Sequence, residues 1–143
     1  MTQEATVMKQ HETPIEDVEA SFPSQASDYI EKPMDLNSIL VYRPAATFFV
    51  RVSGDSMIGA GIQSGDILVV DKSLDARDGS IVIAVLDGEF LVKQFCRWKD
   101  GSVWLVPANP QFQPINVTDR PDFSIFGVVT AYIHRFVRER IRK

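Results

Sequence analysis

Asp87 and Gly88 constrain the fold most, because they separate two apolar segments at residues 81–86 and 89–95. An Asp-Gly pair between two such segments is the strongest short-range signal for a β-hairpin. We therefore expect two antiparallel strands that are joined by a two-residue turn.

The rest of the chain after residue 46 has the same character. Further strands are expected at residues 47–52, 67–70, 103–106 and 123–136, with a loop at 107–114. One short helix is expected from Asp35, a candidate N-cap, to Leu40. Many short strands with almost no helix predict a mostly β fold, a twisted and partly closed antiparallel sheet.

The last of these strands, at residues 123–136, is long and apolar. Such a strand is hazardous at an open sheet edge, where its unpaired backbone groups invite association. Pairing with a second copy of the chain would cover it, and so would a central position in the sheet. The sequence leaves both possibilities open.

Composition excludes several classes of protein. A length of 143 residues with 45% hydrophobic residues suits one globular domain, and a net charge of −4 gives no reason to expect nucleic-acid binding. Cys96 is the only cysteine, and His11 and His134 lie in no metal-ligand motif, so neither a metal nor a cofactor is expected; both histidines are interpreted as surface residues. Without an apolar run long enough to span a membrane and without a signal-like N-terminus, the protein is expected in the cytoplasm.

Ser56 and Lys93 are the candidate catalytic residues. In the strand at 89–95, Lys93 shares a face with Leu91 and Phe95. Apolar neighbours remove water from the amine and lower its pKa, and a neutral lysine can act as general base on a serine hydroxyl. The alternative interpretation is a lysine that reaches water and a serine in an ordinary turn, since sequence separation does not establish contact.

Three motifs together resemble the LexA/UmuD family of self-cleaving serine peptidases. They are Ser53-Gly54-Asp55-Ser56-Met57, the segment from Gly61-Ile62 through Gly65-Asp66 to Asp71, and Asp87-Gly88-Glu89-Phe90 followed by Val92-Lys93. The similarity covers nearly the whole chain, from Phe22 to Val129. It implies that Ser56 is the nucleophile and Lys93 the general base.

The resemblance also implies a place where the chain is cut. The family cleaves itself after a small residue followed by glycine, and Ala20–Ser21 occupies the corresponding position. The chain would then consist of a flexible N-terminal arm, residues 1–21, and a Ser-Lys peptidase domain, residues 22–143. Ser21 departs from the usual glycine, whose backbone freedom a side chain restricts, so cleavage is expected to be slower, or the arm stays uncut.

In the reaction that this implies, Lys93 takes the proton of Ser56 and Ser56 attacks the carbonyl of Ala20. Backbone N–H groups of residues 54–57 are the expected oxyanion donors. No catalytic task is assigned to Asp55, which we expect to face solvent or cap the turn.

Too few residues precede the cleavage site for a helix-turn-helix domain, so the resemblance is to UmuD-like members and not to DNA-reading repressors. No sequence-specific DNA binding is expected. The family relationship implies cleavage stimulated by RecA filaments on single-stranded DNA during the SOS response. It also implies a homodimer whose processed form is a subunit of a UmuC-type translesion DNA polymerase.

Three other functions remain open. The first is a non-catalytic interaction module of the same fold, which Ser21 favours. The second is a single-stranded nucleic-acid binder that uses Trp98, Lys99, Trp104 and the basic C-terminus, against which stands the acidic balance of the chain. The two tryptophans flank a turn and are interpreted as packing residues. The third is a signal-peptidase-like activity, which requires a membrane anchor that the sequence does not contain.

Overall fold

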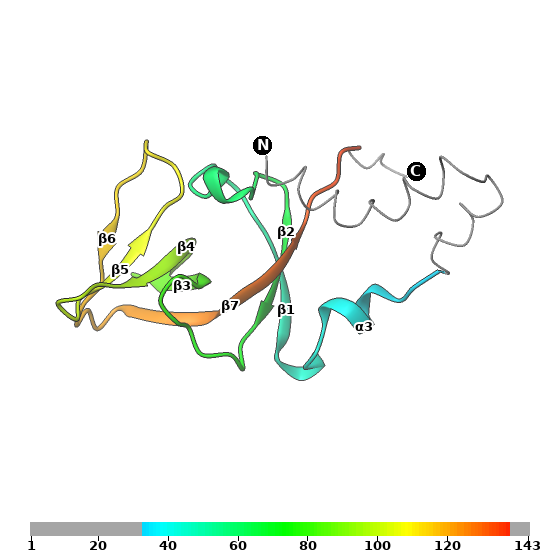
Figure 1. Ribbon diagram of the computed structural model, residues 1–143, viewed down its shortest axis with the longest axis horizontal. Helices are drawn as coiled ribbons and strands as arrows, with labels where there is room; N and C mark the ends of the chain where they lie inside the picture. The colour runs from blue at the N-terminus through cyan, green and yellow to red at the C-terminus, as the bar shows by residue number, and fades with distance from the viewer. Residues whose placement is uncertain (1–32, 138–143) are drawn as a thin grey trace, which may run out of the picture. The chain divides into compact units, whose positions relative to one another are not determined.

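The computed structural model describes residues 33–137, nearly all of which belong to one compact unit that begins at Leu36. The predicted arm and the Ala20–Ser21 bond lie outside the described residues. The elements of the unit (Figure 1) are α3 (Leu36–Leu40), the 3₁₀ helices η2 (Pro44–Ala46) and η3 (Ile58–Ala60), and the strands β1 (Thr47–Arg51), β2 (Ile67–Asp71), β3 (Ile81–Leu86), β4 (Glu89–Arg97), β5 (Val103–Val106), β6 (Ile115–Asn116) and β7 (Phe123–Ile133). The prediction of a mostly β fold is confirmed.

All seven strands form one sheet in the order β1-β2-β7-β3-β4-β5-β6, and every neighbouring pair is antiparallel. The β3–β4 hairpin is the one predicted from Asp87 and Gly88, which have φ angles of 54° and 80°. Positive φ at both turn residues matches the right-handed twist of the paired strands. The short strand β6 was not predicted from the sequence. Its two residues directly follow the segment 107–114, which was predicted as a loop.

The last strand is central. β7 pairs with β3 through its first half and with β2 through its second half, so that it joins the β1–β2 part of the sheet to the part that begins with β3 (Figure 1). The strand therefore lies between β2 and β3 inside the sheet, which is the central position that the sequence left open. The strand ends at Ile133, three residues before the predicted end at Phe136.

Two β-bulges interrupt the pairing of β7. Thr130 is the extra residue where the register with β2 shifts, and Phe126 is the extra residue where the register with β3 shifts. A bulge increases the local twist of the bulged strand. The central strand therefore bends the sheet at two places, which accounts for the twisted sheet expected from the sequence.

Hydrophobic side chains form a cluster on either side of β3. Successive residues of a strand point to opposite faces, and Val82 and Ile83 accordingly belong to different clusters. The first cluster consists of Val82, Ala84, Leu86, Phe95, Leu105, Val117 and Val128. The second consists of Val52, Met57, Ile62, Leu68, Val70 and Ile83, and it lies under the turn that carries Ser56.

His134 lies at the surface, as predicted, but its ring is held by a buried partner. Its Nδ1 is 2.6 Å from Oδ1 of Asp66, a residue that is only 2% exposed. The contact joins the residue that follows β7 to the residue that precedes β2. No helix within residues 33–137 is long and apolar enough to cross a membrane.

Candidate active site

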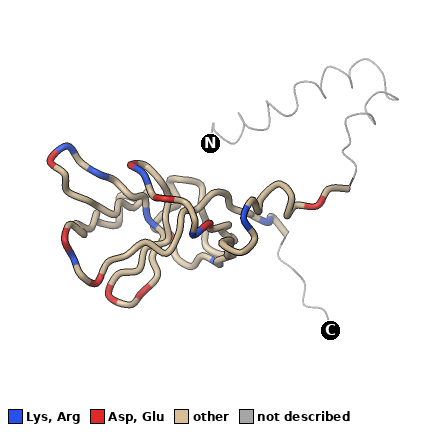
Figure 2. The backbone as a smooth tube through the Cα atoms, turned by 90° about the horizontal axis from the view of Figure 1, so that it is seen from below, with Lys and Arg blue, Asp and Glu red and all other residues tan. Residues whose placement is uncertain are grey.

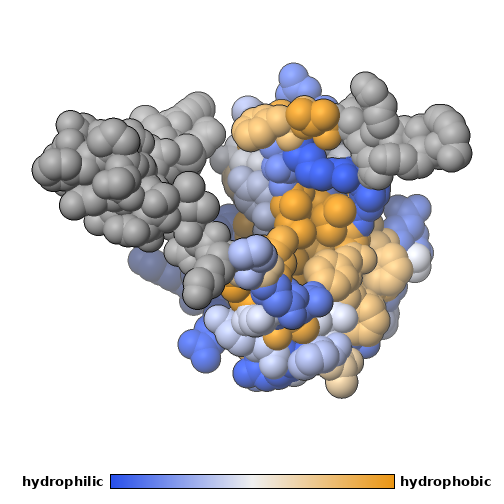
Figure 3. Space-filling model, turned by 90° about the vertical axis from the view of Figure 1, so that its right-hand side faces the viewer, coloured by the Kyte–Doolittle hydropathy of each residue, from blue (hydrophilic) through white to orange (hydrophobic). Residues whose placement is uncertain are grey.

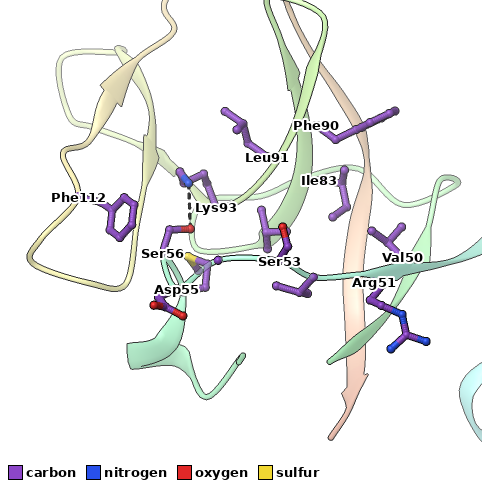
Figure 4. Close-up of a pocket in the computed structure, with 14 residues that line it drawn as sticks. Val50, Arg51, Ser53, Asp55, Ser56, Ile83, Phe90, Leu91, Lys93 and Phe112 are labelled. Atoms are coloured by element: carbon purple, nitrogen blue, oxygen red, sulfur yellow. Dashed lines mark hydrogen bonds between the residues drawn. The ribbon is translucent and has the colours of Figure 1, made fainter. Parts of the chain in front are cut away.

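Ser56 and Lys93 meet in the folded chain. Ser56 lies in the turn between β1 and η3, and Lys93 lies in the middle of β4. The two side chains point toward each other, and Lys93 Nζ donates a hydrogen bond of 3.0 Å to Ser56 Oγ (Figure 4). The resemblance of the sequence motifs to a family implied this contact, which the sequence separation of the two residues alone did not establish.

The surroundings of Lys93 favour the neutral amine. The residue is 7% exposed, and the flanking Leu91 and Phe95 both pack with the first hydrophobic cluster. Burial lowers the pKa of Lys93, because the ammonium loses hydration that the free amine needs less. Within residues 33–137 no carboxylate forms an ion pair with Lys93 that would offset this effect.

The turn that carries Ser56 is anchored at its start. Val52, the residue after β1, donates its N–H to the carbonyl of Asp66 and accepts the N–H of Gly65, at 2.9 and 2.8 Å. Gly54 has a φ angle of +94°, which side chains rarely adopt, so the glycine allows the chain to turn sharply before Ser56. Met57, directly after Ser56, is 3% exposed and fixes the turn to the second cluster.

A pocket of about 270 Å³ opens beside the dyad (Figure 4). It is lined by Val50, Arg51, Val52, Ser53, Gly54, Asp55, Ser56, Met57, Ile83, Phe90, Leu91, Val92, Lys93 and Phe112. Apart from the end that carries Ser56 and Lys93, apolar side chains supply much of the wall. The pocket therefore combines a serine hydroxyl, a buried amine and an apolar wall against which a peptide segment can pack.

Several pocket residues were missed in the sequence. Phe112 comes from the segment that was predicted only as a loop, and Arg51 ends a strand that was interpreted only as sheet. A lone aromatic residue in a loop and an arginine at the end of a strand are common features without functional meaning. Their contribution to the site follows from the topology, which brings β1, β4 and the loop after β5 together.

The remaining predicted residues are placed as follows. Asp55 is exposed and lines the pocket, which agrees with the expectation that it faces solvent. Trp98 and Trp104 stack on each other with ring centroids 4.1 Å apart, which agrees with packing residues that flank a turn. Ala20 and Ser21 lie outside the described residues. Between residues 33 and 137, no three His, Cys, Asp or Glu side chains are arranged to hold a metal ion.

Comparison with known proteins gives a family assignment that agrees with this geometry. The family described as Peptidase S24-like matches residues 13–130. Protein ImpA of Salmonella typhimurium is 48% identical over 125 residues, covering 82% of this chain and 79% of the relative. Protein MucA of Escherichia coli is 41% identical over 114 residues, covering 79% of this chain and 77% of the relative.

A LexA repressor also matches, over a shorter part. The repressor of Syntrophotalea carbinolica is 49% identical over 89 residues, which cover 62% of this chain and 44% of the repressor. The family match and the ImpA and MucA relatives extend over most of the chain, whereas less than half of the repressor is shared. The chain therefore belongs to the Peptidase S24-like family of serine peptidases, as a UmuD-like member of its LexA/UmuD group.

Proposed function

We propose that this SOS-related protein is an autoproteolytic serine endopeptidase that hydrolyses its own N-terminal arm at the Ala20–Ser21 bond. The observation that carries the proposal is the 3.0 Å contact between Lys93 Nζ and Ser56 Oγ in a pocket with an apolar wall. A serine with a buried lysine beside it has the two groups that nucleophilic cleavage of an amide requires, a nucleophile and a base.

The reaction begins when the free amine of Lys93 accepts the proton of Ser56 Oγ. Oγ then bonds to the carbonyl carbon of Ala20, and the carbon–nitrogen bond to Ser21 breaks as the Lys93 ammonium returns the proton to the leaving amine. The ester between Ser56 and Ala20 is hydrolysed by a water molecule that Lys93 deprotonates in the same way. Each proton is returned, so the dyad is regenerated.

Attachment of the arm to the domain makes a modest catalyst sufficient. A bond held in the same chain has a high effective concentration at the dyad once the arm reaches the pocket. The side chain of Ser21, where the family has glycine, restricts the backbone angles near the cut, and we therefore expect slow spontaneous cleavage. Docking of the arm is then the step that regulation controls.

The family membership supports a role in mutagenic DNA repair. We propose that RecA filaments on single-stranded DNA promote docking of the arm, and that the processed chain joins a UmuC-type translesion DNA polymerase. Both partners are inferred for this chain from its relationship with UmuD-like proteins.

A homodimer is part of the proposal, and its support comes from the surface and not from β7. Figure 3 shows one face on which hydrophobic residues gather in patches that hydrophilic residues border and interrupt. Large apolar side chains with at least two fifths of their area exposed include Phe48, Phe49, Phe90 and Tyr132. Covering such side chains is a common reason for association.

A non-catalytic module of the same fold is the second candidate, and Ser21 at the cut position is the feature that favours it. Single-stranded nucleic-acid binding has less support. Lysine and arginine are interspersed with aspartate and glutamate along the described chain and gather on no single side in the view of Figure 2. The rings of Trp98 and Trp104 also stack on each other, so one face of each indole is not free to stack on a base.

The test is incubation of purified protein at neutral pH with RecA, single-stranded DNA and an ATP analogue, followed by intact-mass measurement. We expect a fragment that begins at Ser21 in the wild type, and no fragment in the Ser56→Ala and Lys93→Ala variants. Omitting the DNA is the matched control and should leave the chain largely uncut. An uncut wild type under the complete conditions and at alkaline pH would leave the non-catalytic module as the function.

A further inference from the structure

We infer that Asn109 is a positioning residue of this site, which aims the backbone N–H of Ser56 at the carbonyl oxygen of the bond that is cut. The inference rests on the proposed function and names a part of the site that the dyad does not include. Asn109 lies in the loop between β5 and β6 and contacts the catalytic turn from outside the pocket wall.

The central contact is made to the residue before the nucleophile. Asn109 Nδ2 donates a hydrogen bond of 2.9 Å to the carbonyl oxygen of Asp55. That carbonyl and the N–H of Ser56 belong to one planar trans peptide, in which the two groups point in opposite directions. Fixing the carbonyl toward Asn109 therefore fixes the N–H of Ser56 on the opposite side.

The N–H of Ser56 is available to a substrate. Within residues 33–137, no acceptor forms a hydrogen bond with it, and Ser56 lines the pocket. A backbone N–H of this kind beside a nucleophile can stabilise the negative charge that develops on the carbonyl oxygen under attack. Stabilisation of that kind depends on a donor that is already oriented, and the Asn109 bond supplies the orientation.

The side-chain amide of Asn109 is itself held in the required orientation. Its Oδ1 accepts the N–H of Gln111 at 2.9 Å, which directs the Nδ2 group toward Asp55. The carbonyl of Asn109 accepts the N–H of Phe112 at 3.0 Å, so the same turn also carries the aromatic residue of the pocket.

The preceding residue, Ala108, fixes the next peptide of the catalytic turn. Its N–H donates to the carbonyl of Ser56 at 2.8 Å, and its carbonyl accepts the N–H of Gly59 at 2.7 Å. A Cβ atom at Gly59 would lie 2.6 Å from the Ala108 oxygen, so the close approach requires glycine. Two adjacent residues of one loop therefore hold the peptide planes on both sides of Ser56.

Asn109→Ala and Asn109→Asp test the inference together. The alanine variant removes the donor without adding charge, whereas the aspartate variant keeps an oxygen for the Gln111 N–H, replaces the donor by an acceptor and adds a negative charge. Asn116 offers the matched control, since its Oδ1 accepts the N–H of Thr118, also two residues later, at 3.0 Å and away from the pocket. Asn116→Ala and Asn116→Asp are expected to cleave at the wild-type rate.

The first measurement is the rate of spontaneous cleavage across a pH series, with urea unfolding to show that each variant is folded. Loss of an oxyanion donor typically lowers rates by about 10²–10³-fold, and a donor that is only misaligned should cost about 10–100-fold. We expect Asn109→Ala to lower the rate by that factor at every pH with an unchanged midpoint pH, because Lys93 is untouched. Gly59→Ala should lower the rate through the Ala108 contact.

The second measurement does not depend on cleavage of the arm. A tripeptide boronic acid with the sequence of residues 18–20 bonds to Ser56 Oγ and places a boron-bound oxygen where the oxyanion forms. We expect its affinity to fall at least about tenfold in both Asn109 variants and to stay unchanged in the Asn116 variants.

The outcomes separate the two proposals. Wild-type rates and affinities in folded Asn109 variants would overturn the inference, and so would a changed midpoint pH with an unchanged maximal rate in Asn109→Ala. A wild type that never cuts itself but binds the boronate more tightly than Asn109→Ala would retain the inference and overturn self-cleavage. A wild type that neither cuts itself nor binds the boronate would overturn both.

Discussion

Lys93 Nζ lies 3.0 Å from Ser56 Oγ although β1 and β4, the strands nearest to the two residues, are separated in the sheet by three other strands. Residues of both strands line the same pocket, and the turn after β1 that carries Ser56 is held in place by the buried Val52 and Met57. The dyad therefore depends on the order of the whole sheet, and changes in the sheet are expected to act on the site.

The lowered pKa of Lys93 predicts how the cleavage rate changes with pH. Only the free amine accepts the serine proton, so the rate should rise with pH and level off once Lys93 is deprotonated. Because burial lowers the pKa, the midpoint should lie below about 10.4, the ordinary value for lysine. Initial rates from intact mass at pH 6 to about 10 measure this midpoint.

Lys93→Arg is the control for that profile. A guanidinium remains protonated throughout this pH range, so the variant should stay uncut at every pH. A wild-type rate that is independent of pH or falls as pH rises would contradict the role of Lys93 as a base.

The same burial predicts that Lys93 destabilises the fold near neutral pH. Its pKa is lower in the folded than in the unfolded chain, so between these two values the unfolded chain binds more protons and stability rises with pH. Lys93→Met removes the buried ammonium at similar volume, and the free energy of unfolding at pH 7 should increase by on the order of 1 kcal/mol.

Urea unfolding at pH 7 and at about pH 10, near the unperturbed lysine pKa, checks this result. The advantage of the methionine variant should shrink at the higher pH, because the lowered pKa of Lys93 leaves more of the wild-type amine neutral in the folded chain there. A less stable methionine variant at pH 7 would show that other groups stabilise the ammonium of Lys93 in the folded chain and would contradict a net cost of its burial.

How much of this was predictable from the sequence differs between local and long-range features. The β3–β4 hairpin was predictable because Asp87 and Gly88 determine a turn by their own backbone preferences. The central position of β7 was not, because an apolar strand has the same sequence at a covered edge as in the middle of a sheet. β6 has two residues, too few for any alternation to be recognised.

The site divides in the same way. Ser56 and Lys93 were predictable as a pair only through motifs shared with a family, since their contact depends on how five strands are ordered. Asn109 was not predictable, because its contact with Asp55 joins residues 54 positions apart and an asparagine before a proline is ordinary in a loop. Local chemistry can be read from a sequence, whereas contacts between loops require the fold.

Gly127 in β7 predicts how packing at the centre of the sheet affects stability. A Cβ atom there would lie 2.6 Å from Val70 Cγ1 and 3.2 Å from the carbonyl oxygen of Asp71. Gly127→Ala should therefore lower the free energy of unfolding by about 1–3 kcal/mol, the usual effect of overpacking. Cleavage should slow as well, because Gly127 pairs with Ile83 of the pocket wall.

Ser124→Ala is the control for that substitution. Ser124 lies exposed on the same strand, so its replacement should change the free energy of unfolding by no more than about 0.5 kcal/mol. Equal stabilities of the two variants in urea would show that β2 and β7 separate at little cost.

Intact mass after incubation at alkaline pH shows whether Ser56 and Lys93 cut the chain at Ala20–Ser21 without help from a partner. Purified wild type, Ser56→Ala and Lys93→Ala are incubated without any partner at about pH 10, near the unperturbed lysine pKa. We expect a wild-type fragment whose mass corresponds to residues 21–143, and intact chains in both variants. The same fragment from Ser56→Ala, or a wild-type fragment that begins elsewhere, would contradict this expectation.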